Sequence, residues 1–216
     1  MPLIDTNAHL SRWPFRRVAN DTTPALVAKL KQLGITEAWA GSYDALLHCD
    51  LSAVNERLAA DCRRHGTGFL QAIGCVNLSL PNWEEDLRRC AEVYKMKGIR
   101  LYPNYHQYDL TDARFKKLLA MAAVRGLLVQ IAVMMEEERT QHPLVCVPLI
   151  ELLNQTPKAR VMLLNGFRAV RAGLLLRLQA SRRVWFDLST LDGMAGTGKT
   201  LVAIATALQK VTDQKR

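Results

Sequence analysis

The chain has 216 residues, of which 49% are hydrophobic and 23% are charged, and its formal net charge is +9. This length and composition indicate one globular α/β domain, and no apolar run is long enough to cross a bilayer. The basic residues occur as pairs spread over several expected helices without interleaved aromatic residues, which argues against specific nucleic-acid binding. The chain does not open with the charged segment and following apolar segment of a secretory signal, so we expect a cytoplasmic protein. No C-x-x-C pair occurs, and we expect the cysteines to be reduced.

The first expected strand, Leu3–His9, ends in polar side chains that are two residues apart. The polar residues are Asp5, Asn7 and His9, and the apolar residues Ile4 and Ala8 take the other side. Because successive side chains of a strand point to opposite sides, we expect these three to share one side, as the ligands of a common site would. The alternative is a His9 that is hydrogen-bonded in the core or at its rim.

Short β-rich apolar runs and amphipathic segments alternate along the rest of the chain. The further expected strands are Thr36–Gly41, Gly68–Val76, Gly98–Tyr102, Leu127–Met134, Arg160–Leu164 and Val184–Ser189. A first helix begins at Thr22-Thr23-Pro24 and ends at Gly34, and the others are expected at Leu51–His65, Trp83–Lys97, Asp112–Arg125, Pro143–Gln155, Arg168–Ala180 and Lys199–Thr212. Four of these helices end at a glycine just before the next strand, which indicates a repeated βα unit.

Seven βα units with short loops favour a (β/α) TIM-barrel-like fold over a doubly wound sheet. Such barrels usually have eight units in about 250 residues, so we expect the barrel to be incomplete or open at the eighth. In either architecture the active site lies at the carboxyl ends of the strands. Four of the five histidines, His9, His48, His106 and His142, fall at a strand end or in a following loop. This placement predicts a catalytic or binding site there.

Three segments carry a resemblance to a known family. They are IDTNAH (residues 4–9) with RWPF (12–15), GIRLYPNYH (98–106) and ERTQHP (138–143). Over about residues 1–194 the chain resembles the amidohydrolase-related branch of the amidohydrolase superfamily, the metal-dependent hydrolases and decarboxylases on a TIM barrel. The resemblance implies a divalent metal, usually zinc, which activates water for attack on a carbonyl-like carbon or polarises a carboxylated substrate.

The resemblance also implies roles for single residues. Asn7, His9 and His142 take the positions of metal ligands, but Asn7 stands where the family has the first histidine of an H-x-H pair. Asn165 likewise replaces a histidine after the sixth strand, and the eighth strand with its aspartate is not found. Amide oxygens are poor zinc ligands, so we expect weak metal binding. His106 is the best candidate for substrate or acid–base work, with a hydrogen-bonded loop histidine as the alternative.

The end of the chain carries a second motif. Residues 193–200, GMAGTGKT, match the P-loop pattern G-x-x-x-x-G-K-[ST] between an expected strand and an expected helix. From Gly193 onward the sequence resembles the phosphate-starvation-inducible (PhoH) type of ATPase. The resemblance implies that Gly193, Gly198, Lys199 and Thr200 bind the phosphates of ATP with magnesium. Too few residues follow to supply the magnesium-binding strand of such a domain.

These observations predict one barrel-like domain, residues 1–192, with residues 193–216 packed on it as a P-loop-like turn and helix. Three functions stay open. The first is a metal-dependent hydrolase or decarboxylase that acts on a small carbonyl or carboxylate substrate. The others are ATP binding through residues 193–200, and an inactive barrel fragment produced by truncation or fusion. The open edge of the barrel favours association of two copies.

Overall fold

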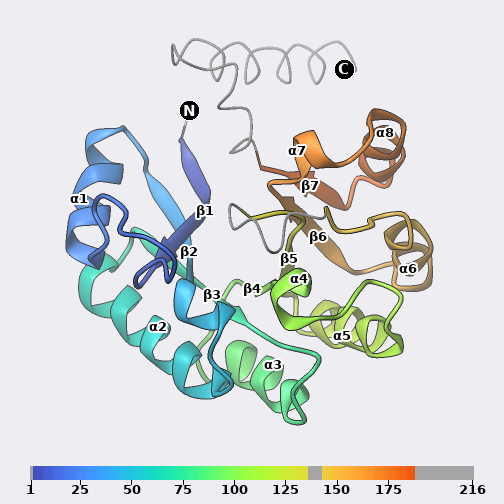
Figure 1. Ribbon diagram of the computed structural model, residues 1–216, viewed down its shortest axis with the longest axis horizontal. Coiled ribbons are helices and arrows are strands. Elements are labelled where there is room, and N and C mark those ends of the chain that lie inside the picture. The colour runs from blue at the N-terminus through green and yellow to red at the C-terminus, as the bar shows by residue number, and fades with distance from the viewer. Residues whose placement is uncertain (1, 136–142, 188–216) are drawn as a thin grey trace.

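A computed structural model of the chain describes residues 2–135 and 143–187. Seven parallel strands form one sheet in chain order, so each strand pairs with the next along the sequence. The strands are β1 (Ile4–Leu10), β2 (Glu37–Ser42), β3 (Leu70–Cys75), β4 (Gly98–Leu101), β5 (Leu128–Ala132), β6 (Arg160–Leu164) and β7 (Val184–Phe186). Figure 1 shows the sheet curled into an open arc with the helices on its outer side. This half-barrel confirms the predicted fold class.

Within the described residues one or more helices follow each strand from β1 to β6, and the longer helices cover the outer face of the sheet. They are α1 (Thr23–Gln32), α2 (Leu51–Gly66), α3 (Trp83–Glu92), α4 (Pro103–His106), α5 (Ala113–Val124), α6 (Leu149–Gln155), α7 (Gly166–Ala169) and α8 (Ala172–Ala180), with a short 3-10 helix η1 (Tyr43–Leu46). No helix within the two described stretches has both the length and the apolar character needed to cross a membrane.

Three predicted helices differ clearly from the structure, whereas the other described ones differ by at most two residues at either end. α3 ends at Glu92 because the chain turns through Lys95, whose φ is +54°, instead of continuing to Lys97. The expected helix from Arg168 to Ala180 is two helices, α7 and α8, separated by the extended residue Val170. α6 begins at Leu149, six residues after its predicted start. The predicted last helix and the 193–216 segment lie outside the described residues.

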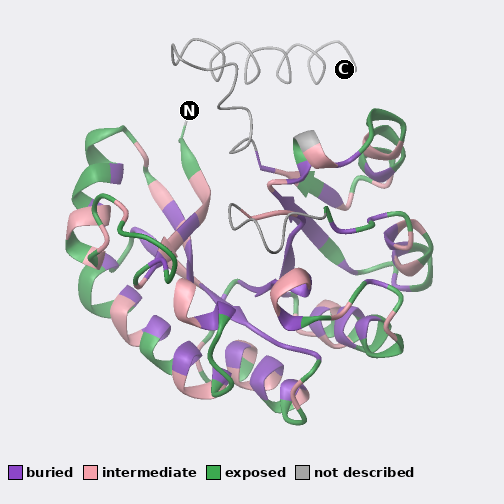
Figure 2. Ribbon diagram, in the orientation of Figure 1, coloured by how far each residue is buried: buried purple, intermediate pink, exposed green. Residues whose placement is uncertain are grey.

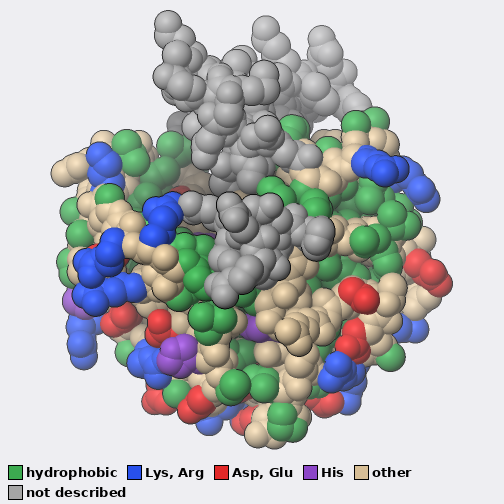
Figure 3. Space-filling model, in the orientation of Figure 1, with side chains coloured by type: hydrophobic (Ala, Val, Ile, Leu, Met, Phe, Trp, Pro, Cys, Tyr) green, Lys and Arg blue, Asp and Glu red, His purple; other side chains and the backbone are tan. Residues whose placement is uncertain are grey.

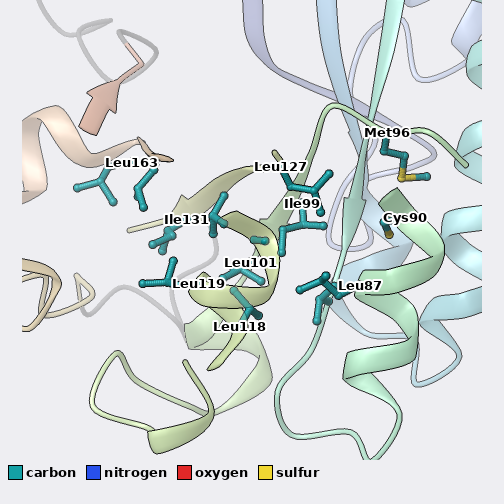
Figure 4. Close-up of a cluster of buried hydrophobic side chains, with 14 of the residues drawn as sticks. Leu87, Cys90, Met96, Ile99, Leu101, Leu118, Leu119, Leu127, Ile131 and Leu163 are labelled. Atoms are coloured by element: carbon teal, nitrogen blue, oxygen red, sulfur yellow. The ribbon is translucent and has the colours of Figure 1, made fainter. Parts of the chain in front are cut away.

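The core lies between the strands and the helices. Every residue of β4 and β5 is buried, as expected for parallel strands covered on both sides. Ile99 and Leu101 of β4 lie together with Leu118 and Leu119 of α5 in this layer (Figure 4). Figure 2 shows the same division, with buried positions along the strands and on the inner faces of the helices. This burial agrees with the sequence pattern of apolar strands and amphipathic helices.

β1 contains a β-bulge that breaks its predicted alternation. Between Asp5 and Ala8 the register with β2 shifts, so that Thr6 and Asn7 together face one residue of β2. Asp5 is consequently out of phase with His9, and its Oδ1 accepts a hydrogen bond of 2.9 Å from the backbone N–H of Asn7. The prediction that Asp5, Asn7 and His9 share one side of a regular strand is therefore wrong for Asp5.

Candidate functional site

Polar side chains gather at the carboxyl ends of the strands, which we call the mouth of the half-barrel. His9 lies near the end of β1, and Tyr102 follows β4. Asn165 follows β6, and Asp187 follows β7. The parallel sheet brings these four residues to one edge although they are far apart in sequence.

His9 is held in one orientation and one protonation state. Its Nδ1 lies 3.0 Å from the carbonyl oxygen of Asn7, and its Nε2 lies 3.1 Å from Tyr102 Oη and 2.9 Å from Arg100 Nη1. The ring stacks on Tyr43 with 4.4 Å between the ring centroids. Burial, and secondly the positive charge of Arg100, hold the pKa of His9 well below its ordinary value. The imidazole is therefore neutral, with its Nε2 lone pair turned inward.

Arg100 is a buried cation at the centre of this arrangement. Its side chain is fully buried, and it donates to the carbonyl oxygens of Ala8 at 3.0 Å, Thr6 at 3.3 Å and Trp39 at 3.3 Å. Its Nε donates to Gln130 Oε1 over 2.8 Å. No carboxylate among the described residues lies within ion-pair distance of it. Within the part of the chain that the structure describes, its positive charge is thus met by neutral acceptors alone.

A second polar cluster joins the two ends of the sheet. Asn7 Nδ2 donates to Asn165 Oδ1 over 3.1 Å and to Asp187 Oδ2 over 2.8 Å. The backbone N–H of Asn165 donates to Asp187 Oδ1 over 2.7 Å. Side chains therefore link β1 to the ends of β6 and β7, although β1 and β7 are the two outer strands of the sheet.

The described side chains at the mouth are not arranged as ligands for a divalent metal ion. Asn7 presents amide N–H groups to Asn165 and Asp187, and the Nε2 of His9 already accepts from a hydroxyl and from a cation. The described residues contain no group of three or more His, Cys, Asp and Glu side chains that could hold a metal. His142, the third predicted ligand, lies outside them. The chemistry considered below therefore rests on the side chains alone.

His106 lies behind Tyr102 and is buried. Its Nε2 donates to the carbonyl oxygen of Ala45 over 2.9 Å, and its ring meets the ring of Tyr102 edge to face at 6.0 Å. Burial lowers the pKa of His106 to about 4, so the ring is neutral near neutral pH. In this position it packs Tyr102 in place, and its catalytic role stays a prediction.

An aromatic wall, composed of Trp13, Phe15, Tyr43 and Tyr105, stands beside His9. Trp13 meets Tyr43 edge to face at 5.0 Å and Phe15 at 5.2 Å, and Phe15 stacks on Tyr105 at 6.4 Å. In Figure 3 basic side chains lie over the segment that follows β1, with hydrophobic side chains next to them. Sequence reasoning missed this wall, although the RWPF motif contains two of its four members.

The remaining predicted site residues fall in two groups. His48 is exposed after η1, so it does not join the mouth cluster. The other group lies outside the described residues and comprises His142, Gly193, Gly198, Lys199 and Thr200.

Comparison with known proteins agrees with the half-barrel. The amidohydrolase family profile matches residues 4–216, including the last two dozen residues, and no finding supports the P-loop resemblance or a truncated chain. The structure is similar to 5-carboxyvanillate decarboxylase from Sphingomonas paucimobilis, with a TM-score of 0.64 and 11% identity over 84% of this chain and 72% of that chain. It is also similar to 2,6-dihydroxybenzoate decarboxylase from Rhizobium, with a TM-score of 0.62 and 11% identity over 82% of this chain and 70% of that chain.

A third similar structure, 5-carboxyvanillate decarboxylase from Novosphingobium aromaticivorans, is a complex with manganese. Its TM-score is 0.60 at 12% identity, over 83% of this chain and 69% of that chain. At these identities the likeness shows the fold alone, and none of the curated proteins matches the chain. The profile match over nearly the whole sequence, on a half-barrel of parallel strands, shows that the chain belongs to the amidohydrolase family.

Proposed function

We propose that the chain is an enzyme of the hydrolase or decarboxylase type whose substrate is a small aromatic molecule carrying a carboxylate. The observation that carries this proposal is the position of Arg100, a buried cation met by neutral acceptors, directly behind His9. In a low-dielectric interior such a charge acts over several ångströms, so a carboxylate at the mouth is favoured over a neutral group.

The aromatic wall suits the ring of such a substrate. Trp13, Phe15 and Tyr43 present ring faces and edges beside His9, and Phe15 is 37% exposed. Aromatic side chains favour offset or edge-to-face contact with another ring. The two decarboxylases named above are described by the aromatic carboxylates they act on, which supports the same class of substrate here.

Tyr102 can donate a hydrogen bond to a bound molecule, and His9 holds its hydroxyl in place. The Nε2 of His9 has a lone pair, and the hydroxyl of Tyr102 donates to it over 3.1 Å. Tyr102 can turn to donate to a substrate oxygen instead, while Nε2 of His9 stays bonded to Arg100 Nη1 over 2.9 Å. Arg100 keeps His9 in the tautomer that accepts from the Tyr102 hydroxyl.

Calorimetric titration with a matched pair of ligands tests the proposal. We expect 2,6-dihydroxybenzoate to bind about tenfold or more tightly than 2,6-dihydroxybenzamide, since the two differ chiefly in charge. Equal binding of the acid and the amide would overturn the proposal, as would the absence of turnover of any hydroxybenzoate in a carbon dioxide release assay with and without added manganese.

Two variants test whether the reaction takes place at the mouth. Tyr102→Phe keeps the buried ring and removes only the hydroxyl, so we expect turnover to fall about a hundredfold or more with little change in stability. Lys116→Gln removes a positive charge from the exposed side of α5, far from the mouth in sequence and fold, and serves as the matched control. Equal activity of the two variants would argue against a role for Tyr102.

A further inference from the structure

We propose a second ligand site at the opposite end of the half-barrel, where the strands begin, for a planar aromatic anion. A cavity of about 430 Å³ opens there. Its lining includes Trp39, Lys97, Arg125, Arg160, Met162 and Trp185. This volume falls within the range of about 300–1,000 Å³ that is typical of small-molecule pockets. The inference goes beyond the proposed function, because none of these side chains belongs to the mouth.

The inner wall of this cavity is apolar and aromatic. Trp39 packs against Leu128 and Met162 inside the arc of strands. Trp185, the register partner of Met162, also lines the cavity and is 44% exposed. Two indole rings in one pocket favour a planar ring over an aliphatic group, because stacked and edge-on contacts add to simple burial.

Positive charge surrounds the rim of the cavity. Lys97 Nζ pairs with Glu37 Oε1 over 3.0 Å, and Arg125 Nε pairs with Glu92 Oε1 over 3.0 Å. Arg160 is different, because no carboxylate of the described chain lies within ion-pair distance of it. With one cation left uncompensated, the rim selects for a negative charge on the ligand.

The guanidinium of Arg160 is placed to bind that charge. Its one hydrogen bond within the described residues goes from Nη2 to the carbonyl oxygen of Gly126. A guanidinium has five N–H donors in a planar fork, so donors remain for a carboxylate or a phosphate. The ligand's ring then lies against Trp39 and Trp185 while its anionic group lies at Arg160.

The buried Arg100 layer separates the two sites. Arg100 Nη2 donates to the carbonyl oxygen of Trp39 over 3.3 Å, and Gln130 Nε2 donates to Met162 Sδ over 3.7 Å. Trp39 and Met162 thus touch the Arg100 layer while lining the cavity. A ligand at the strand starts therefore lies on the opposite side of this layer from a substrate at the mouth.

Calorimetry with two pairs of probes tests this site, namely AMP against adenosine, and naphthalene-2-carboxylate against naphthalene-2-carboxamide. We expect the anion of at least one pair to bind about tenfold more tightly than its neutral partner, and Arg160→Gln to remove that preference. Trp185→Ala should weaken both members of the pair, because it removes ring contact without changing charge. No preference for the anion in either pair would overturn the proposal.

Controls separate this site from the mouth. Lys116→Gln removes the same charge from an exposed position elsewhere, and Tyr102→Phe alters only the mouth, so both should leave probe binding unchanged. If Tyr102→Phe abolishes probe binding while Arg160→Gln does not, the probe occupies the mouth and the second site is refuted. Failure of the hydroxybenzoate assay leaves this test intact, because the variants and probes are different.

Discussion

Arg100 donates a hydrogen bond from Nη1 to Nε2 of His9 over 2.9 Å. Since a guanidinium can only donate, Nε2 must hold a lone pair, and the ring proton must lie on Nδ1, which donates to the carbonyl oxygen of Asn7. The same guanidinium binds the carbonyl oxygens of Thr6 and Ala8, at either side of Asn7. One buried side chain of β4 thus stabilises both the bulge in β1 and the tautomer of the histidine beyond it.

Arg100→Gln should destabilise the fold. The shorter amide cannot reach the carbonyl oxygens of Thr6, Ala8 and Trp39, which then lose donors in a buried place, and we expect the free energy of unfolding to fall by about 2–4 kcal/mol. Urea unfolding followed by circular dichroism measures the change. Lys116→Gln, the exposed control, should stay within about 0.5 kcal/mol of the unsubstituted chain. A similarly small effect of Arg100→Gln would show that the bulge does not depend on Arg100.

Gly41 should not tolerate a side chain. A Cβ there would lie 2.8 Å from Arg100 Nη1 and 3.1 Å from its Cζ, so Gly41→Ala pushes the buried guanidinium away from its acceptors. We expect a loss of about 1–3 kcal/mol of unfolding free energy. Gly173→Ala is the matched control, because a Cβ in α8 meets nothing within 4 Å, and it should stabilise the chain slightly. Equal effects of the two changes would contradict the close packing of Gly41 on Arg100.

Periodicity predicted most of this fold because it reports burial, and burial decides which face of each element packs inward. The strand at Arg160–Leu164 has its predicted bounds, and the helix from Leu51 extends only one residue beyond its predicted end. The end of α3 could not be predicted in the same way. It depends on Met96 donating its N–H to the carbonyl oxygen of Cys90, a closure that a helical pattern does not reveal.

The site was harder to predict because its geometry depends on contacts between distant strands. The resemblance pointed to Asn7 and His9, but not to the bulge that takes Asp5 out of phase with His9. That bulge rests on Arg100 and Gln130, which reach across from β4 and β5 and share the carbonyl oxygen of Thr6. The local signals were an arginine inside the otherwise apolar run of β4 and a glutamine inside that of β5.

His106 should make the fold sensitive to acid. Its pKa is lowered to about 4 in the folded chain from an ordinary value of 6.5, chiefly by burial. As the pH falls through this interval the unfolded chain takes up a proton that the folded chain does not, so stability present above 6.5 is progressively lost. We expect this residue alone to contribute a loss of about 2 kcal/mol between about pH 7 and pH 4.5. Urea unfolding at both pH values measures it.

A substitution isolates that contribution from those of other groups. His106→Gln removes the titrating ring and keeps an N–H donor for the carbonyl oxygen of Ala45. The difference in unfolding free energy between the two pH values should therefore be about 2 kcal/mol smaller in the variant than in the unsubstituted chain. An unchanged difference would show that His106 takes up its proton equally in the folded and unfolded states.

The cluster of Asn7, Asn165 and Asp187 should accept zinc when both amides are exchanged for imidazoles. The three side chains already meet, with Asn7 Nδ2 at 3.1 Å from Asn165 Oδ1 and at 2.8 Å from Asp187 Oδ2. Zinc prefers imidazole nitrogen and carboxylate oxygen, and three such ligands with one water complete a tetrahedral site. We expect the double variant Asn7→His with Asn165→His to bind zinc about a hundredfold more tightly than the unsubstituted chain, measured by competition with a chromophoric chelator.

The control for this gain adds the same two histidines elsewhere. Asn82→His with Asn154→His places them on exposed parts of the chain, at the start of α3 and in α6, where no common ligand position exists. Adding Asp187→Asn to the mouth variant should reverse most of the gain, because it removes the one anionic ligand. If the mouth and control variants bind zinc equally, then Asn7, Asn165 and Asp187 do not converge on one point. In that case the mouth differs from a metal site at more positions than Asn7 and Asn165.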